Sequence, residues 1–138
     1  MSPQLPQPDK AFQRAKEFFE QSTNYARNAA QQWVPHGLVE QQLHINAQQL
    51  MNCLFQAYID QAALLQAQLA TQDAPAGSTF RWRGRTLASW FGPIRICRLG
   101  EYFAGSHEAW FGLDQAIELA QKRYSQGTQR AVVKYCTV

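Results

Sequence analysis

The spacing of apolar residues changes once along this chain, at the segment Asp73-Ala74-Pro75-Ala76-Gly77-Ser78, and this change limits the possible folds more than any other feature. Before the segment, apolar residues recur every three to four positions, which is typical of helices that bury one side. After it, apolar and polar residues alternate, as they do in half-buried strands. A helical half followed by a strand-rich half predicts an α+β fold.

The first half predicts an arm and then a long helical hairpin. Pro3, Pro6 and Pro8 oppose helix formation, so we expect residues 1–8 to be a disordered arm. Residues 9–73 form the predicted hairpin, because Pro35 and Gly37 separate two helical patterns, at about 9–33 and 38–70. In the first helix one apolar stripe repeats every seven residues, and its members are Phe12, Phe19, Ala26 and Trp33, with Ala15, Ser22 and Ala29 between them.

The second predicted helix has an unusually wide apolar face. A repeat of seven residues is widened by further large side chains, namely Met51, Leu54, Phe55, Tyr58, Ile59, Leu65 and Leu69. This face can be covered by the chain's own core, by a C-terminal helix or by a second copy in a homodimer. The pattern alone does not choose among these three partners.

Residues 74–138 predict an arginine-rich β-meander with short C-terminal helices. We expect strands at 79–83 and 86–91 joined by a turn at Gly84-Arg85, then a strand at 94–99 and a short one at 102–103. Alternation predicts one apolar face of the sheet and one face rich in arginine. Helices are expected at 113–123, with Asp114 near the positive end of the helix dipole, and from Thr128 onward.

The charges are distributed unevenly about a net charge of +3. Residues 1–73 carry four basic and six acidic side chains, whereas residues 74–138 carry nine basic and four acidic. Guanidinium groups donate paired hydrogen bonds that suit phosphate, and aromatic rings among them can stack on bases. The candidate DNA-binding residues are therefore Arg81, Arg83, Arg85, Arg95 and Arg98, with Trp82 among them. The alternative is a solvated sheet face whose charges discourage edge pairing.

Other kinds of site have little support. Cys53, Cys97 and Cys136 are widely spaced, and the three histidines form no ligand-spaced cluster with them, so we expect free thiols and no metal or other cofactor. The carboxylates are scattered over unlike elements, which argues against an enzyme. The N-terminus lacks a secretory pattern and no apolar run has the length of a membrane span, so we expect a cytoplasmic protein with no membrane partner.

Residues 91–127 carry a series of short motifs in a fixed order. A Gly-Pro turn leads into an Ile-Arg-Ile strand, then a Leu-Gly kink, a Leu-Asp helix and an Arg-Tyr-Ser-x-Gly cap. This order resembles the N-terminal region of the Kra-type (ISKra-like) insertion-sequence transposases of bacteria, which carry a DDE catalytic domain. The matching positions are Gly92, Pro93, Ile94, Arg95, Ile96, Arg98, Leu99, Gly100, Leu113, Asp114, Leu119, Arg123, Tyr124, Ser125 and Gly127.

The resemblance implies a DNA-binding and assembly region of a transposase, and its departures limit what else it implies. Gly112 and Ala120 stand where the family often has proline, and residues 101–110 lack the Cys-x-x-Cys ribbon of some relatives, so no zinc is implied. The family's catalytic domain lies downstream of this region and is not in the chain, so no catalysis is expected. The alternative is a helical protein–protein interaction module with no nucleic-acid role.

Overall fold

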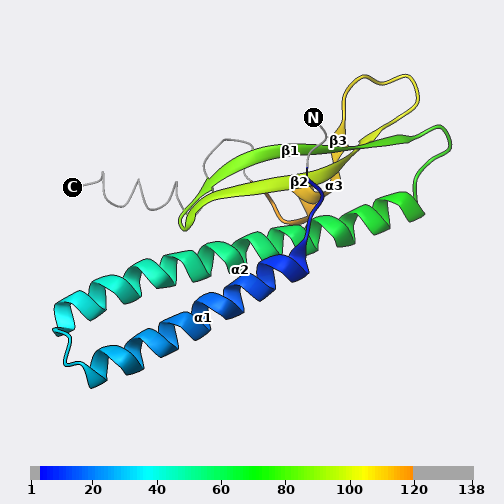
Figure 1. Cartoon of the computed structure of the whole chain (residues 1–138). Helices are drawn as coiled ribbons and strands as arrows, with labels where there is room; N and C mark the ends of the chain where they lie inside the picture. Colours follow the sequence, from blue (N-terminus) through cyan, green and yellow to red (C-terminus); the bar gives the residue numbers. More distant parts are fainter. Residues whose placement is uncertain (1–3, 120–138) are drawn as a thin grey trace, which may run out of the picture.

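A computed structural model describes residues 4–119, and it confirms the α+β class (Figure 1). Two long helices form a hairpin, and a three-stranded antiparallel sheet lies along the C-terminal half of the second helix. The elements in chain order are α1 (Pro8–Gln31), α2 (His36–Gln72), β1 (Thr79–Ser89), β2 (Gly92–Tyr102), β3 (Trp110–Phe111) and α3 (Gly112–Ala116). The expected helix from Thr128 and the Arg-Tyr-Ser-x-Gly motif lie outside the described residues.

The turn of the helical hairpin is made by a hydrogen-bonded helix end. After α1, the N–H of Val34 donates to the carbonyl of Ala29 at 3.0 Å and the N–H of Trp33 donates to that of Ala30 at 3.3 Å. This is the Schellman pattern, in which the residue after the cap adopts a left-handed conformation and is usually glycine. Here Trp33 takes that position with a φ of 57°, and its side chain is 89% exposed.

Small residues line the contact between α1 and α2. Ala15 and Ala29 of α1 are buried, as are Cys53 and Ala57 of α2. The predicted stripe of large α1 side chains is wrong in this respect, because Phe12, Phe19 and Trp33 are at least 39% exposed. Helices that approach closely need small side chains at the contact, so the alanines between the aromatic positions fill it instead.

The sheet has longer strands than the sequence indicates. β1 pairs with β2 without interruption from Thr79 opposite Tyr102 to Ser89 opposite Gly92. The expected turn at Gly84-Arg85 and the expected break after Leu99 are therefore both wrong. The turn lies at residues 90–91, where Gly92 has a φ of 103° and the Ser89 hydroxyl donates to its carbonyl at 2.6 Å. This longer β1 reaches Leu87, which pairs with Ile94, and both side chains are buried.

The main core lies where one face of the sheet meets α2 and α3. Its fully buried members come from α2, both long strands and α3, and they are Ile59, Ala63, Leu87, Ile94, Ile96 and Leu113. Burying a large aliphatic side chain contributes about 1.5–3 kcal/mol, so this cluster joins the hairpin to the sheet. α3 ends at Ala116, well before the expected Arg123, because Glu118 adopts a φ of 50° and the N–H of Leu119 donates to the carbonyl of Asp114 at 2.8 Å.

Side-chain amides of α2 bind the free edge of β2. β3 pairs only with Gly100 and Glu101, so among residues 4–119 the preceding part of that edge has no neighbouring strand. Gln56 donates to the Arg95 carbonyl at 2.7 Å and accepts from the Arg95 N–H at 2.9 Å, as a paired strand would. Asn52 donates to the carbonyls of Phe91 and Pro93 at 3.0 and 3.1 Å. These bonds satisfy main-chain groups that a sheet edge otherwise leaves open.

Candidate nucleic-acid interface

The strand register divides the candidate arginines between the two faces of the sheet. Residues opposite each other in an antiparallel pair share a face, and alternate residues of a strand do too. Arg83 is opposite Arg98, so Arg81, Arg83, Arg85 and Arg98 share one face. Arg95 is opposite Thr86 and lies on the other face, with Trp82. The prediction of one arginine face is therefore wrong for Arg95. Arg95 and Arg98 are an odd number of residues apart in one strand, so their side chains lie on opposite faces.

The face with four arginines also holds the aliphatic core, so the predicted separation into an apolar face and an arginine face is wrong as well. The two kinds of residue are separated along the strands instead of across the sheet. Leu87, Ile94 and Ile96 occupy the end near the β1–β2 turn and are buried. Arg81 and Arg83 occupy the opposite end and are exposed. α2 and α3 cover the aliphatic end of this face, which leaves the arginine end open.

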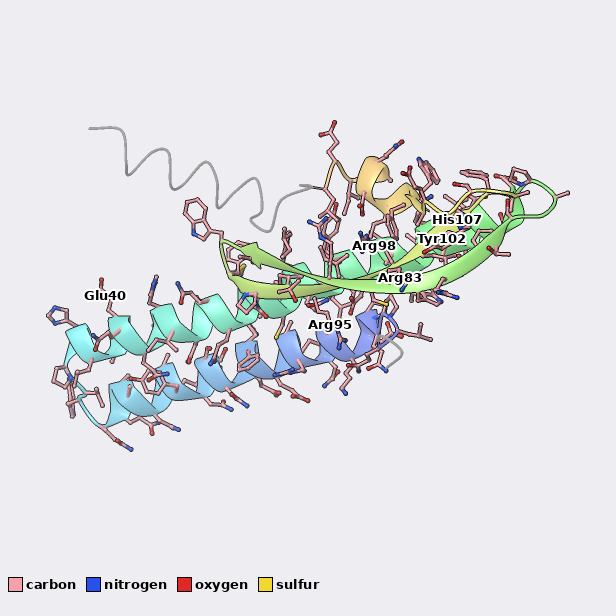
Figure 2. The ribbon with its side chains drawn as sticks, turned by 90° about the horizontal axis from the view of Figure 1, so that it is seen from above. Glu40, Arg83, Arg95, Arg98, Tyr102 and His107 are labelled. Carbon is pink, nitrogen blue, oxygen red and sulfur yellow. The ribbon has the colours of Figure 1, made fainter. Side chains whose placement is uncertain are left out.

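Arg83 lies next to an aromatic hydroxyl at the open end. Its Nη2 and Nε donate to the Tyr102 Oη at 3.3 and 3.4 Å (Figure 2). Sequence reasoning did not select Tyr102, because it placed that residue in a separate strand. Phe103, the next residue, is 42% exposed, whereas Trp110 is opposite Glu101 and therefore lies on the other face. The open end therefore combines two exposed arginines with the Tyr102 ring.

Arg98 is buried and bound within the protein. Its side chain is 9% exposed, and its Nε lies 3.0 Å from the Asp114 Oδ1 in α3. The guanidinium carbon lies 3.8 Å from the centroid of the Phe111 ring, which is a cation–π geometry. Gly100 makes room for that ring, since a Cβ at Gly100 would lie 2.9 Å from a Phe111 ring carbon. Arg98 thus joins β2, β3 and α3, and Asp114, expected to act on the helix dipole, is its ion-pair partner.

Arg85 is half-buried next to that ion pair. Burial lowers the pKa of its guanidinium, repulsion from Arg98 lowers it further, and attraction to Asp114 opposes both effects. Trp82 is half-buried on the other face, opposite Leu99. Of the six candidates, the structure therefore brings only Arg81 and Arg83 together as exposed neighbours.

Arg95 belongs to a different part of the surface. Its Nη1 donates to the Gln4 Oε1 at 2.7 Å, next to the start of α1 (Figure 2). Residues 4–7 of the expected arm have no helix or strand, and the Gln7 N–H donates to the Asp60 carboxylate at 3.3 Å. Arg95 is thus separated from Arg81 and Arg83 by the thickness of the sheet.

Within residues 4–119 no three His, Cys, Asp or Glu side chains are grouped as metal ligands, and none of the helices there is long and apolar enough to cross a membrane. Cys53 and Cys97 are free, buried thiols, and burial raises the pKa of Cys97.

Comparison with protein-family models, with curated proteins and with solved structures found no match in any of the three. The transposase resemblance stays a prediction that depends on the motif order in residues 91–127.

Proposed function

We propose that the chain binds DNA through the open end of its sheet and acts in the cytoplasm as the DNA-binding and assembly region of an insertion-sequence transposase, without catalysis of its own. One observation carries the proposal. Within residues 4–119, neither Arg81 nor Arg83 has a carboxylate within ion-pair distance, although both are exposed. Two guanidinium groups without carboxylate partners attract an anion, and phosphate fits their paired donors.

The surroundings of the two arginines favour a nucleic acid over a simple anion. The Tyr102 ring lies beside Arg83 on the same face of the sheet, Phe103 follows it in the chain and is exposed, and rings next to cations are suited to contact with bases. The one acidic residue of the paired strands, Glu101, is 6% exposed and lies on the other face. The strands at the open end therefore offer positive charge and an aromatic ring without a carboxylate on the same face, although Glu108 of the β2–β3 loop is exposed.

The test is a salt-dependent binding measurement. Fluorescence anisotropy of a labelled DNA duplex at about 50 and 200 mM salt gives the slope of the logarithm of the association constant against the logarithm of the salt concentration. This slope is negative, and its magnitude is about 0.9 per phosphate contact. We expect Arg81→Gln combined with Arg83→Gln to weaken binding and to reduce the magnitude of this slope by about 2. Arg27→Gln, which removes an exposed cation from the far part of α1, is the matched control and should bind as the parent does. A folded parent that fails to bind at low salt would disprove the proposal.

A specific observation also favours assembly through the helical hairpin. Large side chains in the middle and C-terminal part of α2 are at least 38% exposed, and they are Met51, Leu54, Tyr58, Leu65 and Leu69. Their spacing of three, four and seven residues puts them along one side of the helix over about 27 Å. A stripe of this length, interrupted by no charged side chain, matches the seam of a helix pair formed by two copies of the chain.

Sedimentation separates the two roles. Leu54→Glu with Leu65→Glu should convert a dimer to a monomer, because it introduces like charges at the centre of the seam. The arginine variant should lose DNA binding and keep the same oligomeric state. A parent that sediments as a monomer at all concentrations tested would exclude the dimer and leave DNA binding untouched.

A further inference from the structure

A second basic region lies on the face of the sheet opposite Arg81 and Arg83. A hollow of about 320 Å³ is formed by the beginning of α1, the middle of α2 and β2. Three cations line it, Lys10 and Arg14 from successive turns of α1 and Arg95 from β2. No part of this hollow belongs to the proposed DNA surface, which uses the other face.

The cations of the hollow are not neutralised by ion pairs. In the described part of the chain, none of the three has a carboxylate within ion-pair distance. The single acid that lines the hollow is Asp60, which is 7% exposed. Its two oxygens already accept from the Gln56 amide at 2.9 Å and from the Gln7 N–H at 3.3 Å. Asp60 attracts Arg95 only through space, so the hollow keeps an excess of positive charge.

The hollow also contains donors that bind no acceptor within the described part of the chain. Arg95 uses one of its guanidinium N–H groups on the Gln4 Oε1, and a guanidinium has five such groups. Lys10 contributes three ammonium donors and Arg14 a second guanidinium, and no hydrogen bond from either side chain occurs within residues 4–119. Three cationic side chains from two elements, α1 and β2, thus line one space large enough for a small ligand.

We infer that this hollow binds a small free anion with a phosphate or diphosphate group, held by Lys10, Arg14 and Arg95. Phosphate oxygens accept several charge-assisted hydrogen bonds at once, and guanidinium groups bind them in pairs. The ligand joins α1 to β2 across the start of the chain. The inference is independent of the proposed DNA binding, because the two sites share no residue.

The test is a titration of inorganic pyrophosphate into the whole chain, measured by isothermal titration calorimetry. The ionic strength is kept constant, and chloride is the reference anion. We expect saturable binding that Lys10→Gln combined with Arg14→Gln weakens at least tenfold, since each lost charge-assisted bond costs about that factor. Both side chains are exposed, so the variant should keep the parent's circular dichroism and unfolding midpoint. Arg81→Gln with Arg83→Gln is the control and should bind pyrophosphate as the parent does.

Three results would overturn the inference. The first is a dissociation constant weaker than about 10 mM for the parent. The second is an equal loss in the Arg81 and Arg83 control, which would show that only the overall charge matters. The third is displacement of pyrophosphate by a short DNA duplex, which would make the hollow part of a nucleic-acid surface.

Discussion

Removing the carboxylate of Asp114 should destabilise the sheet far more than loss of a surface ion pair would. In the Asp114→Ala variant the Arg98 guanidinium keeps only a 3.4 Å bond to the Arg83 carbonyl and its stacking on Phe111. Breaking a buried ion pair by removing one partner costs about 3–5 kcal/mol, because the other charge stays buried alone. Asp114 itself is 24% exposed, so water can reach part of the vacated space. We therefore expect the lower end of that range, about 3 kcal/mol.

The neighbouring charge increases the effect. Arg85 feels repulsion from Arg98 and attraction to Asp114, so the variant removes the attraction and keeps the repulsion. Urea unfolding followed by tryptophan fluorescence gives the loss in the free energy of unfolding. The informative control is Arg98→Met combined with Asp114→Ala, which removes both charges and leaves an apolar side chain of similar length. This double variant should regain most of the stability that Asp114→Ala loses.

Two outcomes would refute this reasoning. A loss below about 1 kcal/mol for Asp114→Ala would place the pair among surface ion pairs, which contribute little. A double variant as unstable as the single one would show that lost packing, and not a stranded charge, causes the effect. Either result would remove Arg98 from its assigned role in joining β2 to α3.

Two further predictions concern other parts of the fold. Trp33→Gly should stabilise the protein by about 1 kcal/mol in urea unfolding, because a left-handed conformation costs an L-residue about 1–2 kcal/mol and this side chain is 89% exposed; a loss of stability would mean that Trp33 is packed in solution. Burial raises the pKa of Asp60 above its ordinary value, so the folded protein binds that proton more tightly than the unfolded chain does. The parent should therefore gain stability relative to Asp60→Asn as pH falls from neutral through the folded pKa, and the gain should be complete below the unfolded pKa. Melting temperatures of both proteins across this range check the prediction. A parent whose melting temperature falls relative to that of Asp60→Asn as pH falls would contradict it.

The helices were predictable because their signals are local. Pro35 and Gly37 mark the break between them, and the change of period at 73–78 marks where strands begin. What the period did not reveal is which positions of α1 are buried. Phe19 and Ala15 both follow helical spacing, and only the close approach of α2 shows that the small residue is inside.

The sheet was harder to predict because its register depends on distant pairs. Gly84-Arg85 is as good a local turn signal as residues 89–92, and the choice is made by the burial of Leu87 opposite Ile94. The burial of Arg98 depends on Asp114 and Phe111, which come later in the chain. The separation of Arg95 from Arg98 was the exception, since strand alternation alone predicts it.

The hydrogen bonds between the Gln56 side-chain amide and β2 affect how the protein resists aggregation. Their donor and acceptor are side-chain atoms of a helix, so they last only while α2 stays in place. If proteolysis within residues 73–78 allowed the hairpin to leave, β2 would present a row of unpaired main-chain groups. Such a row is a template for strand addition from a neighbouring molecule. The hairpin therefore protects the solubility of the sheet, and an isolated fragment of residues 74–138 would be prone to edge-to-edge association.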